Sequence, residues 1–301
     1  MIPLLAALLA VFQSAPPSPA PSAASYVPQR VFDTHRRAFS DFEQMLADTA
    51  SADVVFVGEE HDSANTHRLE LAVLEGLTRR HRSLVLAMEM FERDVQPALD
   101  DYLSGTATEQ QFLAAARPWP RYATDYRPSV EFAREHHIPV VASNVPRRIA
   151  SEVSKNGLAA IGSLGDDRRL AAADLECPTS GDYYDRFLEA MTDHTASNMQ
   201  ASTDLRGRND RYYLAQCVKD ETMGESVAGA VLKSREQSSI VVHYNGSFHS
   251  EFAEGTVAST ARRLPGRRLV VVSIVTVSDM DALAPAAADL RRADYVVYTL
   301  R

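Results

Sequence analysis

Five short apolar runs, separated by segments of helical pattern, constrain the fold of this chain most strongly. Runs of this length that end in turn residues indicate buried strands. Between the first two, Leu69, Val73 and Leu77 recur at the spacing of one helix face. Strands that alternate with helices predict an α/β fold: a mostly parallel sheet flanked by helices. The five runs occupy residues 53–58, 84–90, 138–143, 239–244 and 269–277.

The remaining patterns complete the predicted architecture. A helical insertion at about 156–234 is expected between the third and fourth strands, and residues 295–300 read as an edge strand. Helices are expected at 31–50, 94–105, 108–116, 128–137, 146–154 and 252–264.

The N-terminal residues have the pattern of a targeting segment. Residues 2–12 form an apolar run of 11 residues, well short of the roughly 20 that cross a bilayer as a helix. A small-x-small pattern ends at Ala24, so residues 1–24 predict a cleavable signal peptide and 25–301 the α/β domain. We therefore expect a secreted or periplasmic protein without a transmembrane helix. No Cys near the cleavage point offers a lipid anchor.

Charge and cysteine content exclude several classes. The 31 Lys and Arg against 40 Asp and Glu give a net charge of -9, which offers no basic field for nucleic acid. Only Cys177 and Cys217 are present, so Cys-only zinc sites and iron–sulfur clusters are excluded. These two either pair as a disulfide or leave Cys217 packed as a small hydrophobe.

Polar residues follow four of the strands, where ligands bind in α/β sheets. The first strand ends in Gly58-Glu-Glu-His61 and the fourth in Gly246-Ser-Phe-His249. Glu89 closes the second strand, and Asn144 follows the third. Because Gly permits a tight turn at each strand end, we expect the two His side chains to converge.

Two kinds of chemistry suit such a site. His61, His249 and Glu89 could ligate a divalent metal, or a carboxylate-oriented imidazole could activate water without one. Glu89 needs a partner because a charged carboxylate at the end of an apolar strand is costly. Glu59 and Glu60 have a second explanation, since Glu is favourable near a helix N-terminus. His67 reads as a helix-surface residue.

An aromatic cluster lies between the second and third strands. Trp119, Tyr122 and Tyr126 suit a core or a lid, although a Tyr hydroxyl near the sheet edge could also ligate ferric iron. The sequence contains no phosphate loop, dinucleotide-binding fingerprint, nucleophile elbow or His-Glu-x-x-His helix.

Taken in order, five segments resemble the ChaN-like haem-binding proteins of the wider Tiki, TraB and erythromycin-esterase superfamily. The match spans about residues 50–277 of the chain. The segments are VVFVGEEHDSANTHRLELAVLEGL (54–77), LAMEMFERDVQPALDDYL (86–103), Tyr126-Arg-Pro with EFAREHHIPVVASNVPRR (131–148), AQCVKDETMGESV (215–227) and HYNGSFHSEF (243–252).

The resemblance implies paired Gly-x-x-His motifs and a Glu in one site, which fall here on His61, His249 and Glu89. It also implies haem as a cofactor, envelope localisation and a homodimer with a Tyr ligand, for which Tyr126 is the best candidate. Glu60 and Asn144 complete the expected cofactor-binding set. The absence of the anchor Cys departs from the lipoprotein members.

Three hypotheses follow, and whether the chain is an enzyme stays open. The first is an exported haem- or iron-binding protein, with haem or another small molecule as its partner and a role in haem uptake implied by the resemblance. The second is a hydrolase of the esterase or metallopeptidase type that uses His61, His249 and Glu89. The third is a protein-binding envelope component with a vestigial pocket.

Overall fold

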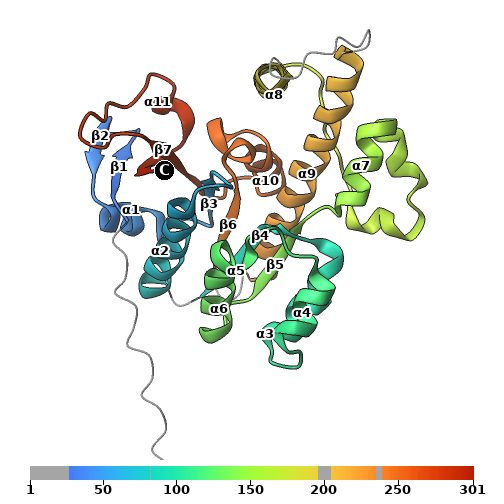
Figure 1. The fold of residues 1–301 in the computed structure, drawn as a ribbon, viewed down its shortest axis with the longest axis horizontal. Helices are drawn as coiled ribbons and strands as arrows, with labels where there is room; N and C mark the ends of the chain where they lie inside the picture. Colours follow the sequence, from blue (N-terminus) through green and yellow to red (C-terminus); the bar gives the residue numbers. More distant parts are fainter. Residues whose placement is uncertain (1–26, 82, 196–204, 235–238) are drawn as a thin grey trace, which may run out of the picture.

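The computed structural model describes residues 27–81, 83–195, 205–234 and 239–301. One eight-stranded sheet runs through it in the order β2-β1-β8-β7-β3-β6-β4-β5, parallel except where β1 pairs with β2 and with β8 (Figure 1). The α/β prediction is therefore confirmed. The strands are β1 (Gln29–Asp33), β2 (Ala38–Ser40), β3 (Val54–Glu59), β4 (Leu84–Glu92), β5 (Val140–Asn144), β6 (Ile240–Gly246), β7 (Leu269–Val277) and β8 (Tyr295–Leu300).

Helices cover both faces of the sheet, as buried parallel strands require. The α-helices are α1 (Phe42–Thr49), α2 (Ala64–Arg80), α3 (Gln96–Leu103), α4 (Glu109–Ala116), α5 (Tyr122–Asp125), α6 (Arg127–Glu135), α7 (Arg147–Asn156), α8 (Asp182–Thr195), α9 (Leu205–Lys233), α10 (Thr256–Arg263) and α11 (Asp289–Arg292). Short 3₁₀ turns are η1 (Arg93–Val95), η2 (Leu158–Ser163), η3 (Gly165–Leu170), η5 (Ser247–His249) and η6 (Glu251–Ala253).

The core divides into two layers on either side of the sheet. Leu74 of α2 packs with Val55 and Tyr244 on one face. Val227 of α9 packs with Val54 and Val241 on the other. Successive residues of β3 thus point to opposite layers, which explains why its apolar run is continuous rather than alternating.

Two sequence-based expectations were wrong. The segment 31–50 is not one helix: it forms β1, β2 and α1, because Val31 and its neighbours pair with β8. Its apolar spacing fits both structures, and long-range pairing decides between them. The second concerns β8, which is internal, since β1 covers one side and β7 the other.

Between β5 and β6, where the insertion was expected, the chain forms α7, η2, η3, α8 and α9. The C-terminal half of α9 packs on the sheet through Val227 and Val231, so this helix belongs to the main core. The expected signal peptide lies outside the described residues. Within the described part, no helix is both long and apolar enough to cross a membrane.

Candidate functional site

The carboxyl ends of β3, β4 and β6 meet at one edge of the sheet. In the parallel register, Glu59 of β3 lies opposite Gly246 of β6. This register sets the two Gly-x-x-His turns side by side. We call the group of His61, Glu89 and His249 around Gly246 the strand-end site.

Gly246 lets these side chains approach. A Cβ built on Gly246 would lie 2.6 Å from His61 Nε2 and 3.7 Å from Glu89 Oε2. The first separation is too short for any side chain, so His61 occupies the space that a larger residue would need. Its imidazole therefore lies directly over the β6 backbone, beside Glu89.

His249 is held between two carboxylates. Its Nδ1 lies 2.7 Å from Asp220 Oδ1 on α9, and its Nε2 lies 3.3 Å from Glu89 Oε1. Glu89 also accepts a 2.7 Å hydrogen bond from the backbone N–H of Gly246. Burial opposes charge on this imidazole, but Glu89 and Asp220 together raise the pKa of His249 to about 10. Burial raises the pKa of Glu89, but His249 and His61 outweigh it and hold that pKa well below its usual range.

His61 lies at the mouth of the strand-end site, with 46% of its side chain exposed. Its Nδ1 is 2.5 Å from Glu59 Oε1, which leaves Nε2 without a hydrogen-bond partner among the described residues. Burial lowers the pKa of His61, yet the bond to Glu59 and the charge of Glu89 raise it above its usual value. The ring packs edge-on against Trp119, at 5.0 Å between centroids.

Trp119 also lines a hollow of about 570 Å³, whose lining does not include His61. It carries three Arg side chains beside a Pro-Trp-Pro turn, and we call it the Trp119 hollow. Arg117 and Arg148 are both paired with Asp94. The guanidinium of exposed Arg147 has no ion pair among the described residues. The lining comprises Glu92, Arg117, Pro118, Trp119, Pro120, Arg147, Arg148 and Ser151.

The sequence pattern of the family described as "Haem-binding uptake, Tiki superfamily, ChaN" matches residues 45–259. The chain belongs to this family. The resemblance seen in the sequence is thus confirmed, and the ChaN family is a haem-binding one.

A solved ChaN structure from Campylobacter jejuni, which binds haem cofacially, has the same fold. It matches with a TM-score of 0.65 and 17% identity, over 91% of this chain and 97% of that one. An erythromycin esterase matches at a TM-score of 0.45 and 14% identity, over 91% and 83%, a level that says nothing about shared chemistry.

Among curated proteins, the chloroplastic RETICULATA-RELATED 5 of Arabidopsis thaliana is 24% identical over 235 residues. The alignment covers 74% of this chain and 31% of that protein. This ChaN-family chain therefore spans about a third of its curated relative.

Three residues of the expected cofactor-binding set make hydrogen bonds within this ChaN-family chain. The hydroxyl of buried Tyr126 donates to Glu59 Oε1 at 2.9 Å, and burial together with the Glu59 charge raises its pKa. Glu60 accepts from the N–H and hydroxyl of Thr276. Asn144 donates to the backbone carbonyl of Glu89. Tyr126 and Asn144 thus hold Glu59 and the Glu89 backbone in place, and Glu60 holds the end of β3 against β7.

The expected metal trio of His61, Glu89 and His249 does not gather its ligand atoms within 4.8 Å. Within the described ranges, that spacing is met by Glu59, His67 and Glu70. His67 was expected on a helix surface and is only 3% exposed. The reason is that positions 67, 70, 74 and 77 form the row of α2 that faces the sheet. That spacing was visible in the sequence.

Asp220 and His243 were missed by sequence reasoning. Asp220 could have been noticed as an acidic residue one turn after Cys217 on an otherwise apolar helix stripe. His243 is fully buried on β6, where Ser143 and Asn245 contact its two ring nitrogens at 3.1 Å. Desolvation lowers the pKa of His243 to about 4, so it packs as a neutral imidazole.

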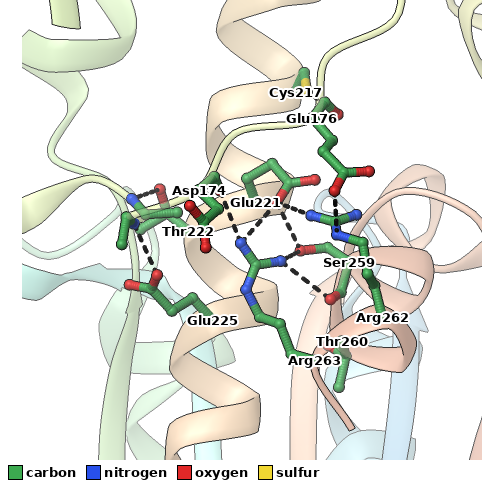
Figure 2. A network of polar contacts seen from close by, with 12 residues as sticks. Asp174, Glu176, Cys217, Glu221, Thr222, Glu225, Ser259, Thr260, Arg262 and Arg263 are labelled. Carbon is green, nitrogen blue, oxygen red and sulfur yellow. Dashed lines mark hydrogen bonds and ion pairs between the residues drawn. The ribbon is translucent and has the colours of Figure 1, made fainter. Parts of the chain in front are cut away.

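Cys177 and Cys217 form a disulfide, which settles the alternative that the sequence left open. Figure 2 shows Cys217 on the same helix as Glu221, whose carboxylate points toward Arg262 and Arg263 of α10. Arg262 also pairs with Glu176 at 3.0 Å. The disulfide ties Cys177 to α9 one turn before Asp220, and the ion pair with Arg262 ties Glu176 to α10.

Proposed function

We propose that this chain binds haem beside Trp119, where His61 would ligate the iron and the Arg side chains of the neighbouring Trp119 hollow would face the propionates. One observation carries the proposal: His61 is half exposed beside Trp119, Glu59 holds its Nδ1, and its Nε2 has no hydrogen-bond partner among the described residues. Because Nε2 lies against Gly246 in this structure, the ring would shift away from Gly246 to reach an iron. A carboxylate behind the distal ring nitrogen is the usual arrangement for a metal-bound His. Bound haem would supply an iron that accepts such a nitrogen.

The residues around His61 fit the group. A volume of about 570 Å³ lies within the roughly 300–1,000 Å³ range of cofactor sites. The Trp119 ring offers a flat apolar wall, and the guanidinium of Arg147 suits a propionate carboxylate. Tyr126, in contrast, would have to give up its bond to Glu59 before it could reach iron.

A haemin titration of the purified chain tests this. We expect saturable binding with a shifted Soret band, and at least a tenfold loss of affinity in His61→Ala. Arg147→Ala should weaken binding less. Tyr126→Phe is the matched control, because it removes a hydroxyl that is buried on Glu59. Loss of the band in Tyr126→Phe with full binding by His61→Ala would reject His61 as the ligand.

We further propose export and a homodimer. The signal-like N-terminus and the disulfide between Cys177 and Cys217 support an oxidising compartment. Fractionation with mass measurement of the mature N-terminus tests export, and retention of residues 1–24 in a cytoplasmic fraction would contradict it.

Light scattering with and without haemin tests the homodimer by giving the oligomeric state, and a single-chain mass in both conditions would contradict a dimer.

A hydrolase is the second candidate, favoured by the position of His249 between Glu89 and Asp220. With a pKa of about 10, this imidazole is protonated at neutral pH. It would therefore donate a proton to a leaving group rather than activate water. An ester and peptide panel tests this reading: activity lost in His249→Gln and Glu89→Gln, with folding retained, supports it. Activity equal to that of the wild-type chain in both variants rejects it.

A further inference from the structure

A second polar cluster lies behind the strand-end site, on the opposite side of Glu59. It consists of Glu59 from β3 with His67 and Glu70 from α2, and we call it the α2 cluster. Each of the three is between 1% and 3% exposed. None of the chemistry proposed above uses His67 or Glu70.

The α2 cluster has the geometry of a cation site. His67 Nδ1 lies 2.6 Å from Glu59 Oε2 and 3.3 Å from Glu70 Oε2. The three ligand atoms lie within 4.8 Å of one another. Ligand bonds of about 2.0–2.2 Å around one ion bring such atoms to roughly 3–4 Å apart, so small shifts of these side chains would admit an ion.

The carboxylate oxygens of the cluster are short of hydrogen-bond donors. Glu70 Oε1 has no hydrogen-bond partner although Glu70 is 99% buried, and the close contact of Glu59 Oε2 with His67 Nδ1 is not aligned as a hydrogen bond. A buried carboxylate oxygen without a donor is costly, and such groups in proteins are paired or coordinate metals. Glu70 Oε1 therefore points to an absent positive partner.

The neighbouring residues hold the three side chains as an outer shell would. Asp125 Oδ2 lies 3.4 Å from His67 Nε2, the ring nitrogen opposite the cluster. The Tyr126 hydroxyl and His61 Nδ1 both contact the other oxygen of Glu59. A carboxylate behind a ligating His and hydrogen bonds behind a ligating carboxylate orient metal ligands in proteins.

Charge also favours a cation. Glu59, Glu70 and Asp125 bring three carboxylates together, and among the described residues only Arg121, 3.0 Å from Asp125, adds a permanent positive charge.

We propose that the α2 cluster binds one divalent transition-metal ion through His67 Nδ1, Glu59 Oε2 and the Glu70 carboxylate. One imidazole and two carboxylates suit Zn²⁺, Mn²⁺ or Co²⁺. Because Glu59 also contacts His61, the ion fixes the carboxylate that orients His61. The site is separate from haem and does not depend on the haem proposal.

Metal titration of the purified chain tests the site. After removal of metal with a chelator, we expect one equivalent of Zn²⁺ or Co²⁺ to bind per chain, measured by elemental analysis and by the Co²⁺ visible spectrum. Glu70→Gln and His67→Gln should each lower the affinity at least tenfold. Glu89→Gln and His249→Gln should leave it unchanged, because they alter only the strand-end site.

Two further measurements keep the test decisive. Circular dichroism shows whether each variant folds. If Glu70→Gln fails to fold, His67→Gln decides, because it removes a ring nitrogen of the site and leaves both carboxylates in place. Metal loss that follows Glu89→Gln instead of the α2-cluster variants, or no binding by the wild-type chain, would overturn the proposal.

Discussion

At the scale of single residues, the strand-end site depends on the absence of a side chain at Gly246. His61 Nε2 lies 2.6 Å from where a Cβ on that residue would be, and Glu89 accepts from the same residue's N–H. One glycine therefore sets both the distance of the imidazole from the sheet and the anchoring of the carboxylate. The Gly of each Gly-x-x-His motif matters as much as the His.

Replacing Gly246 by Ala should displace His61. The added Cβ would lie 2.6 Å from His61 Nε2, so the imidazole must move and its hydrogen bond to the orienting Glu59 carboxylate should be lost. We expect at least a tenfold loss of haemin affinity with the fold retained, measured by Soret titration and circular dichroism. Gly229→Ala on α9 is the control, because nothing lies within 4 Å of its Cβ position. Equal haemin affinity in both variants would contradict the prediction.

His249 should make stability depend on pH. Its pKa in the folded chain is about 10, above the value of 6.5 expected when unfolded. The folded state therefore holds a proton that the unfolded state releases between these values. Stability from this group is complete below about pH 6.5 and declines as the pH rises toward 10.

The measurement is denaturant unfolding at pH 7, 8 and 9. His249→Gln should be less stable at pH 7, by about 3–5 kcal/mol, because two buried carboxylates lose their partner. It should also show a flatter decline toward pH 9, although His67, whose pKa is likewise raised to about 10, keeps part of the slope. Exposed His136→Gln is the control. An unchanged slope in His249→Gln would refute this assignment.

At the scale of elements, α9 joins the strand-end site to the disulfide. It carries Asp220, which holds His249, and one turn earlier Cys217, which bonds Cys177. The Glu221 ion pairs with Arg262 and Arg263 fasten the same turns to α10 (Figure 2). The helix turns on either side of Asp220 are thus fixed, by the disulfide to Cys177 before it and by the ion pairs to α10 after it.

Removing the disulfide should destabilise the chain. It closes a loop with a sequence separation of 40 residues, which corresponds to about 4 kcal/mol in the chain-entropy account. We expect the double variant Cys177→Ala, Cys217→Ala to lose up to that amount in denaturant unfolding. Wild-type protein unfolded with reductant present should match it. A difference between these two would place the effect in side-chain packing instead.

At the scale of the whole molecule, the N-terminal hairpin completes the sheet. β1 pairs antiparallel with β8, so the last strand of the chain is covered by the first. The sheet then ends at the short strand β2, where Phe39 is 40% exposed. Short edge strands of this kind limit pairing with other chains.

A charge placed in β8 tests this arrangement. Val297 is 0% exposed between β1 and β7, so Val297→Lys buries an unpaired ammonium and should cost more than about 4 kcal/mol or prevent folding. Phe39→Lys on the edge strand β2 should change stability by no more than about 1 kcal/mol. Thermal unfolding measures both. Similar small losses in the two variants would show that this face of β8 is not buried against the core.

The sequence by itself determined the parallel core strands, most of the helices, and the position of His61, Glu89 and His249 at strand ends. It could do so because hydrophobic periodicity and turn residues are local signals, and the carboxyl ends of parallel strands meet at one edge. The predictions of one helix at 31–50 and of an edge strand at 295–300 were wrong, because an apolar pattern does not specify which strand pairs with which.

Only the tertiary structure decided which polar groups meet. Asp220 reaches His249 from a helix 29 residues away in sequence, and Tyr126 reaches Glu59 across 67. His67 and Glu70 are separated from the surface by the packing of α2 on the sheet. Such contacts depend on the register of β3 against β6 and on how each helix is rotated over the sheet, which are properties of the folded chain.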